Sequence, residues 1–128
     1  MAVYSVVRTP AFDLLAEEYR REHPKLAEDV EWLTGRLAQA PEQMGDHVPE
    51  LRGLALPIFK TRCKDSCHRI GASGAWRIYY AISKSAGKVL LLFLHHKKEY
   101  ENPGAKFLLQ KMERAFVSAS KPPGKARP

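Results

Sequence analysis

The chain has 128 residues, enough for one domain with a hydrophobic core of its own. Hydrophobic residues make up 45 % of it and charged residues 27 %, which is typical of a globular protein and excludes a disordered or membrane-embedded chain. The longest apolar run, Val89 to Leu94, is far too short to span a bilayer, so no membrane partner is expected. The first residues lack the basic start and apolar stretch of a secretory signal, and a cytoplasmic location is therefore expected.

The net charge of +7 is divided unevenly along the chain. Residues 1–50 contain five Lys/Arg and ten Asp/Glu, a net of −5, whereas residues 51–128 contain sixteen and four, a net of +12. Basic charge concentrated in one half favours a polyanionic partner, with nucleic acid first. A solubilising surface is the simpler alternative, but the acidic first half argues against a uniformly basic surface.

The N-terminal part predicts a strand followed by two helices. Residues 2–8 are rich in β-branched side chains and predict a short strand. Thr9 and Pro10 predict a helix start, with Thr9 as the N-cap and the proline at the first helical position. A second helix is predicted after Pro24, and the short link between the two predicts an antiparallel hairpin. The apolar stripe of the second helix consists of Leu26, Val30, Leu33 and Leu37.

The middle of the chain predicts a loop and then three strands. Residues 41–57 contain three prolines and two glycines, and are predicted to lack regular structure. Residues 58–63 and 76–83 alternate in polarity, whereas residues 88–96 are apolar on both faces, as in a central strand. Short links between consecutive strands predict an antiparallel meander.

The last predicted element is a helix, with Asn102 as its cap, Pro103 in its first turn and its end near Ser118. Residues 119–128 have no means of packing and are predicted to form a disordered basic tail, which leaves one domain over residues 1–118. The predicted order is β-α-α-β-β-β-α. It corresponds to an α+β fold, with an antiparallel sheet and a helical hairpin packed on one face.

Three cations are predicted to share one face of the sheet. Lys60 and Arg62 lie two residues apart on one strand, and Arg77 lies on the next strand along the chain. We call these three residues the basic strand face. Like charges on one sheet face repel each other, and a phosphate backbone would compensate them. The alternative is a solvated strand face with scattered charges.

A cluster of titratable groups follows the last strand, at His95, His96, Lys97, Lys98 and Glu99. Cleavage of RNA by its own 2′-hydroxyl needs a base for that hydroxyl, cations for the phosphate and an acid for the leaving 5′ oxygen. The cluster can supply the base and the acid, and the basic strand face the cations, with no metal or other cofactor. The two histidines point to opposite faces of a regular strand, and the alternation groups Lys97 with His95 and Lys98 with His96.

Tyr79, Tyr100 and Lys64 are further candidates for contacts with RNA. Tyr79 shares the face of Arg77 and Tyr100 follows the strand-end cluster, so either ring could stack on a base. Packing within the fold is the alternative for both tyrosines.

A zinc site is a further possibility, built from Cys63, Cys67 and His68 with one of the two strand-end histidines. The ligand pattern is incomplete. Two reduced and inert cysteines are the preferred interpretation, and two cysteines cannot form a disulfide framework.

These residues, in this order, resemble the RelE/ParE superfamily of bacterial toxins from type II toxin–antitoxin pairs, and in particular its RelE and HigB-like branches. The resemblance covers roughly Val3 to Phe116. It is sharpest in three segments, which are similar to the family's central strands: "FKTR", "SGAWRIYY" and "LLLFLHHKKEYEN".

On this match, the basic strand face occupies the family's basic positions on the sheet. Lys97 occupies the lysine after the last strand, or Lys98 does if the frame shifts by one residue. The pair His95–His96 departs from the family, because many relatives have an aromatic or small residue there. Residues 41–57 and 117–128 are also long for the family.

The resemblance implies a fold like that of small microbial ribonucleases. It implies a metal-independent endoribonuclease, an mRNA interferase, that cleaves mRNA in the ribosomal A site, leaves a 2′,3′-cyclic phosphate and thereby inhibits translation. The expected partners are the ribosome, mRNA and a cognate antitoxin. The alternative is a non-enzymatic inhibitor of DNA gyrase, as in the ParE branch. A toxin that retains only antitoxin binding and DNA-linked autoregulation is a third possibility.

Overall fold

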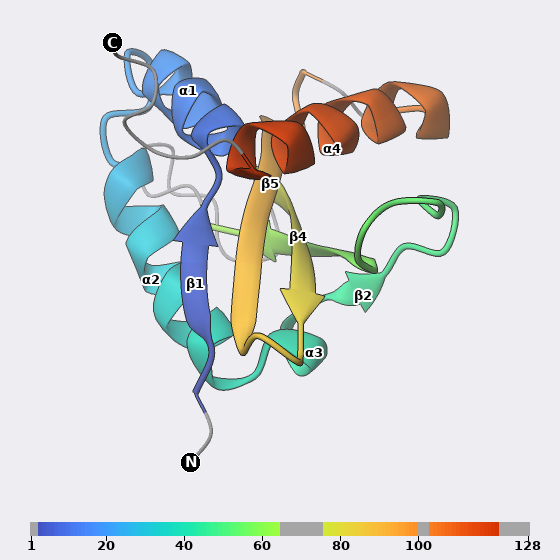
Figure 1. Ribbon diagram of the computed structural model, residues 1–128. Coiled ribbons are helices and arrows are strands. Elements are labelled where there is room, and N and C mark those ends of the chain that lie inside the picture. The colour runs from blue at the N-terminus through green and yellow to red at the C-terminus, as the bar shows by residue number, and fades with distance from the viewer. Residues whose placement is uncertain (1–2, 65–75, 100–102, 121–128) are drawn as a thin grey trace, which may run out of the picture.

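The computed structural model describes residues 3–64, 76–99 and 103–120, and it contains every strand and helix that the sequence predicts (Figure 1). Two short elements, α3 and β2, are additional. In chain order the elements are β1 Ser5–Arg8, α1 Pro10–Tyr19, α2 Leu26–Gln39, α3 Pro41–Met44, β2 Asp46–His47, β3 Ile58–Cys63, β4 Trp76–Ser83, β5 Lys88–His96 and α4 Ala105–Ser120.

The five strands form one sheet in the order β1-β5-β4-β3-β2. The predicted antiparallel meander of β3, β4 and β5 is confirmed, and β2 pairs with β3 in the same sense. β1 runs parallel to β5, because the chain leaves β1 through two helices and returns to the sheet at its other edge. β5 thus lies between β1 and β4, which explains why it is apolar on both faces.

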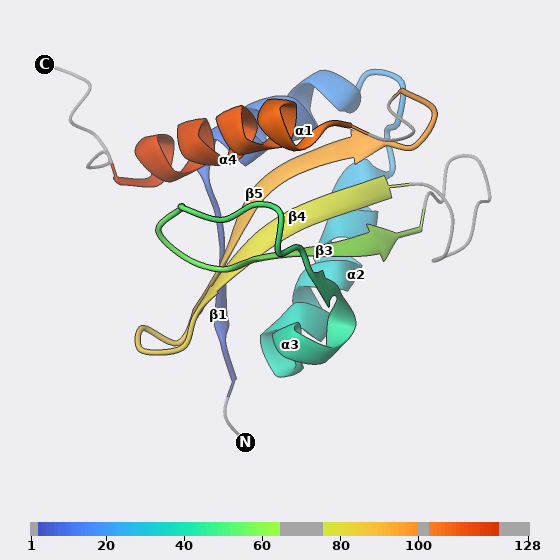
Figure 2. The same ribbon diagram turned by 90° about the vertical axis from the view of Figure 1, so that its right-hand side faces the viewer.

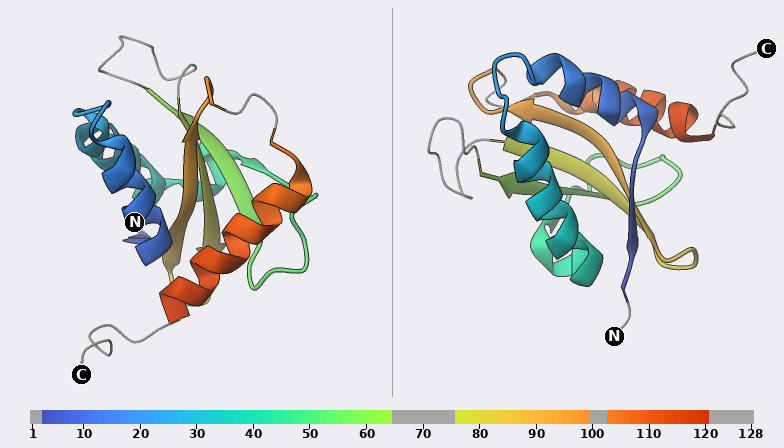
Figure 3. Two further views of the ribbon diagram at one scale, coloured as in Figure 1. Left: turned by 90° about the horizontal axis from the view of Figure 1, so that it is seen from above. Right: turned by 90° about the vertical axis from the view of Figure 1, so that its left-hand side faces the viewer.

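The sheet separates two hydrophobic cores. The first contains the apolar stripe of α2 together with Phe12 of α1 and Trp76 and Ile78 of β4. The second contains Tyr79 and Phe93 on the opposite face, packed against α4. Figure 3 shows α2 on one side of the sheet and α4 on the other. The last helix therefore covers the face that the predicted hairpin leaves open.

The start of α1 follows the sequence prediction. The Thr9 side chain accepts a hydrogen bond from the backbone N–H of Phe12 at 3.2 Å, and Pro10 occupies the first turn. The same hydroxyl donates to the carbonyl oxygen of Leu91 at 2.8 Å, and Thr9 is completely buried. One side chain therefore caps the helix and fixes it to the central strand.

The prediction that residues 41–57 lack regular structure was wrong for α3 and β2. Hydrogen bonds from distant strands hold these elements. The Tyr80 hydroxyl donates to the carbonyl oxygen of Pro41 at 2.7 Å, and the Thr61 hydroxyl donates to that of Met44 at 3.0 Å. No local pattern in the sequence shows such partners.

The boundaries of the last helix also differ from the prediction. α4 begins at Ala105, so Pro103 precedes the helix, and it ends at Ser120, two residues into the predicted tail. Asn102 and the rest of the predicted tail lie outside the described residues. No helix in the described ranges is long and apolar enough to cross a membrane.

Candidate active site

The strand register brings the basic strand face and His95 together. Arg77 lies directly opposite Arg62 of β3 and directly opposite His95 of β5, and Lys60 lies opposite Tyr79. Residues directly opposite each other in a sheet project to the same face. The last residues of β3 and β5 and the first residues of β4 lie at the same end of the sheet (Figure 2). The predicted grouping of these cations is therefore observed, with one histidine beside them.

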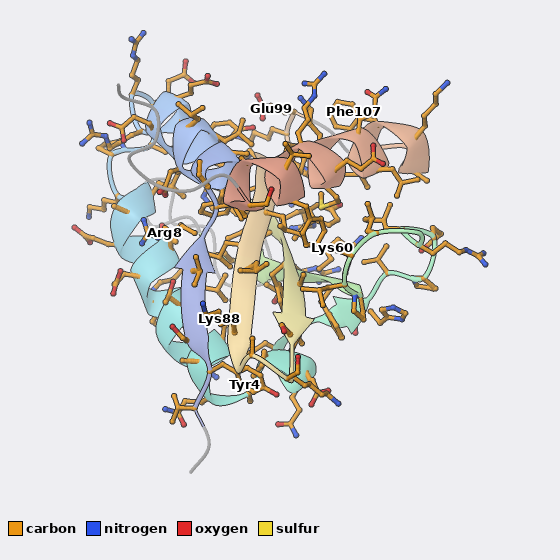
Figure 4. All side chains as sticks on the ribbon, viewed as in Figure 1. Tyr4, Arg8, Lys60, Lys88, Glu99 and Phe107 are labelled. Atoms are coloured by element: carbon orange, nitrogen blue, oxygen red, sulfur yellow. The ribbon has the colours of Figure 1, made fainter. Side chains whose placement is uncertain are left out.

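A cavity of about 230 Å³ lies on this face, and we call it the strand-face pocket. Its floor consists of Lys60, Arg77, Tyr79 and His95. Figure 4 shows Lys60 beside the segment that joins β2 to β3, below α4. That segment and the start of α4 provide the remaining walls, with Val48, Glu50, Leu51, Pro103, Ala105 and Leu108.

His95 is the histidine of the pocket, and it is 1 % exposed. Its ring is stacked on Tyr79 at 5.9 Å between centroids, and its Nδ1 lies 3.4 Å from the carbonyl oxygen of His96. With the proton on Nδ1, directed at this carbonyl, Nε2 is the ring nitrogen that can accept a further proton, and this atom is itself buried. Burial lowers the pKa of His95, and the charges of Arg77 and Lys60 lower it further. The sequence predicts this direction from the cations alone, whereas burial is the larger cause.

Arg77 is the half-buried cation of the pocket. Burial lowers the pKa of its guanidinium, and the charge of Arg62 across the strand pair lowers it further. A guanidinium remains charged at neutral pH in spite of this. Two cations held opposite each other, one of them partly desolvated, form a site that an anion stabilises.

Tyr79 is 2 % exposed, and its ring packs against Phe93 and His95. Burial raises the pKa of its hydroxyl to about 12. The hydroxyl therefore keeps its proton at neutral pH and can donate a hydrogen bond in the pocket. Stacking on a base stays a prediction for Tyr79, and a hydrogen bond to substrate is the role that its position favours.

His96 lies on the opposite face of the sheet. Its ring is stacked on that of His23 at 5.2 Å between centroids and meets Trp76 edge to face at 4.9 Å. Its Nδ1 accepts a hydrogen bond from the backbone N–H of Lys98 at 3.3 Å, and the residue is 4 % exposed. His96 thus packs against α1 and the α1–α2 link, away from the strand-face pocket.

The strand ends at His96, and the next three residues form an exposed turn. Lys98 and Glu99 line a groove with His96, as the strand alternation predicts for Lys98, and the Tyr19 hydroxyl donates a hydrogen bond to the Glu99 carboxylate. Lys97, which the alternation groups with His95, is exposed in this turn and does not line the strand-face pocket. Tyr100 falls outside the described residues.

Lys64 follows the end of β3, and its Nζ lies 4.8 Å from the centroid of the Trp32 ring of α2. It is therefore near the outer edge of the sheet rather than in the strand-face pocket.

Sequence reasoning missed Glu50, which lines the strand-face pocket and brings a carboxylate next to its cations. Glu50 belongs to the segment that the sequence predicts as a plain loop. Its position depends on β2 pairing with β3, which no local pattern indicates.

The structure describes only part of the possible zinc site. Cys63 is buried, with its Sγ 3.4 Å from the carbonyl oxygen of Asp29. Cys67 and His68 lie outside the described residues. Within the part of the chain that is described, no three His, Cys, Asp or Glu side chains are arranged to hold a metal ion.

Two of the larger hollows on the surface have a different chemistry. One of about 710 Å³ lies between residues 53–55 and the second half of α4, and another of the same size lies along α1. Neither is lined by a histidine or by the basic strand face. The strand-face pocket is therefore the better candidate for catalysis.

Comparison with known proteins concerns the fold. No family model matches the chain, and no curated protein sequence matches it. Among solved structures, the crystal structure of the RelBE2 toxin–antitoxin complex from Mycobacterium tuberculosis contains a similar chain, with a TM-score of 0.55 and 25 % identity. The match covers 75 % of this chain and 93 % of that one. The chain therefore has the fold of a RelE-like toxin, as the resemblance implies.

Proposed function

We propose that this RelE-like protein is the toxin of a type II toxin–antitoxin pair and a metal-independent endoribonuclease that cleaves mRNA on the ribosome. The observation that carries the proposal is the strand-face pocket, where His95, with a lowered pKa, faces Lys60 and Arg77. A buried histidine with a lowered pKa and two strand-face cations in one cavity form an arrangement that is typical of functional sites.

The proposed reaction uses the 2′-hydroxyl of the RNA as the nucleophile. Nε2 of His95, uncharged at neutral pH, takes the proton of this hydroxyl. The oxygen attacks the adjacent phosphorus, and the bond to the 5′ oxygen of the next nucleotide breaks to leave a 2′,3′-cyclic phosphate. Lys60, Arg62 and Arg77 stabilise the extra negative charge on the phosphate oxygens.

Two further groups complete the proposed mechanism. Tyr79, protonated at neutral pH, donates a hydrogen bond to a phosphate oxygen. We assign protonation of the leaving 5′ oxygen to Lys97, which is exposed directly after the strand and matches the lysine of the resemblance. No step requires a metal ion.

The proposed partners follow from the same comparison. The similar solved chain belongs to a toxin–antitoxin complex, and we propose that a cognate antitoxin binds and neutralises this protein in the cytoplasm. The ribosome would hold the mRNA over the strand-face pocket.

Cleavage of A-site mRNA on purified ribosomes tests the proposal. The wild-type protein should cut mRNA without added metal beyond what the ribosomes need, and the product should end in a 2′,3′-cyclic phosphate. Arg77→Ala should reduce the cleavage rate about a hundredfold or more, as for loss of one group that stabilises transition-state charge. Arg77→Lys should recover only part of it, because an ammonium cannot grip two phosphate oxygens in parallel.

The control is the fold of each variant. Arg77 is half-buried near the start of β4, so the variants should keep the wild-type circular dichroism spectrum. Full cleavage by soluble, folded Arg77→Ala would show that the active site lies elsewhere.

A further inference from the structure

A second hollow adjoins the strand-face pocket at the outer edge of the sheet, and we call it the edge groove. It has a volume of about 760 Å³ and passes from the sheet to α2. Lys60 and Arg77 line both hollows, so the two adjoin at these side chains. A strand of RNA whose scissile phosphate lies in the pocket would therefore have a path along the edge groove.

The edge groove carries positive charge. Arg36, Lys60, Arg62 and Arg77 line it, against the single carboxylate of Asp46. Four cations and one anion give a net lining charge of +3. Beyond Lys60 and Phe59, the outer side of β3 is paired with no other strand in the described chain, so the groove runs along an open sheet edge.

Trp32 gives this groove an aromatic wall. Four large apolar side chains are exposed among the described residues, and Trp32, which is 37 % exposed, is the only aromatic one of them. Arg36 and Lys64 lie over its ring, with the guanidinium carbon at 5.2 Å and Nζ at 4.8 Å from the ring centroid. Two cations thus contact the ring, Arg36 from the same helix and Lys64 from directly after β3.

An aromatic ring between cations, at the end of a basic groove, has the chemistry that single-stranded nucleic acids require. Bases stack on the ring, and the cations bind the phosphates on either side. The alternative is that these cation–π contacts only stabilise the free protein. That role does not explain why the ring borders a groove. A phosphate that binds Lys64 would draw its ammonium away from the ring and open that face to a base.

We infer that Trp32, Arg36 and Lys64 form a subsite for a nucleotide of single-stranded RNA that flanks the scissile phosphate. This inference rests on the proposed function for the position of the scissile phosphate. The subsite itself is a binding site whose occupation can be measured without cleavage.

Tryptophan fluorescence gives a direct readout, because the chain has two tryptophans and Trp76 is completely buried. A short single-stranded RNA with 2′-O-methyl groups, which cannot be cleaved by 2′-hydroxyl attack, should quench the emission of the wild-type protein. Trp32→Phe should abolish the quenching and leave the emission of Trp76. Trp32→Ala should weaken RNA binding roughly tenfold, within the range measured for loss of one base-stacking platform.

A matched control separates the subsite from general attraction of RNA to a basic protein. Arg36→Ala and Lys88→Ala each remove one exposed cation, but Lys88 begins β5 at the far end of that strand. Arg36→Ala should weaken binding at low salt more than Lys88→Ala does. Equal losses from the two variants, or no quenching of the wild-type protein, would overturn the inference.

The proposed cleavage reaction and the proposed subsite can be refuted independently of each other. Quenching that depends on Trp32, in a protein that cuts no mRNA on ribosomes, would refute the proposed reaction and support the subsite. Cleavage by a protein whose affinity for RNA is unchanged by Trp32→Ala would refute the subsite alone.

Discussion

At the scale of single residues, the two adjacent histidines show how strand geometry assigns different environments to identical side chains. His95 faces cations in a cavity, whereas His96 is stacked on His23 and meets Trp76 edge to face on the other side of the sheet. Both are almost completely buried, so exposure does not distinguish them. What distinguishes them is the set of neighbouring groups, which the alternation of a strand fixes.

We expect unequal effects from replacing the two histidines. His95→Ala should reduce cleavage of ribosome-bound mRNA about a hundredfold, as for loss of a general base. His96→Ala should change the cleavage rate of the folded protein little, and should instead lower its melting temperature because it leaves a cavity beside Trp76. If both variants cleave at the wild-type rate, His95 is a packing residue and the proposed base is wrong.

The lowered pKa of His95 predicts a pH dependence. The cleavage rate should rise with pH as His95 loses its proton and level off below the ordinary histidine value of about 6.5. Stability should follow the same direction: the unfolded chain binds this proton more tightly than the folded one, so the free energy of unfolding falls as the pH drops below the unfolded pKa. Rate profiles of wild type and His95→Ala check this, because the step should be missing from the variant.

At the scale of secondary structure elements, the segment after α2 shows that close packing can stabilise a short strand, β2, where the local sequence predicts a loop. A Cβ added at Gly45 would collide with the carbonyl oxygen of Lys60 and lie 2.7 Å from the Tyr80 hydroxyl. The glycine therefore lets the chain between α3 and β2 approach the middle of β3. This approach places the following segment, with Glu50, over the strand-face pocket.

Two glycine substitutions should have opposite effects on stability. Gly45→Ala should lower the free energy of unfolding by about 1–3 kcal/mol, the usual cost of forcing extra volume into a packed site. Gly35→Ala, within α2 and with nothing within 4 Å of the added Cβ, should raise it by about 0.5–1 kcal/mol. Thermal or denaturant unfolding measures both. Equal melting temperatures for Gly45→Ala and wild type would show that the β2 segment packs more loosely than the structure indicates.

At the scale of the whole molecule, the acidic and basic halves of the sequence form different elements of the structure. The basic C-terminal half supplies β3, β4 and β5 and therefore the basic strand face, and the acidic N-terminal half supplies α1 and all of α2. The cations of the basic strand face thus lie on β3 and β4, while six of the ten acidic residues of the first half lie on α1 and α2; Glu50 and Asp46 line the two hollows. Such separation would steer RNA to one side of the protein.

Expression of the chain without an antitoxin should arrest growth by stopping translation. Incorporation of labelled methionine should fall before that of labelled thymidine, because cleavage of mRNA removes the template for translation directly. Co-expression of the cognate antitoxin should restore growth, and Arg77→Ala at equal soluble level should be the inactive control. An earlier fall of thymidine incorporation would favour inhibition of DNA gyrase instead.

The sequence by itself determined the element order, the meander and the faces of its strands. These features depend on local periodicity and on caps such as Thr9 with Pro10, which adjacent residues carry. It also determined that Lys60, Arg62 and Arg77 share a face, because the strand period is two and short links allow neighbouring strands to pair.

Only the tertiary structure decided which histidine joins those cations, because the choice depends on the register of β4 with β5 and on where the strand ends. The tertiary structure also decided which residues form the walls of the strand-face pocket, that β1 pairs in parallel with β5, and that Lys64 contacts Trp32. These features join segments far apart in the chain. Their energies come from close packing and long-range hydrogen bonds, which leave no periodic trace in the sequence.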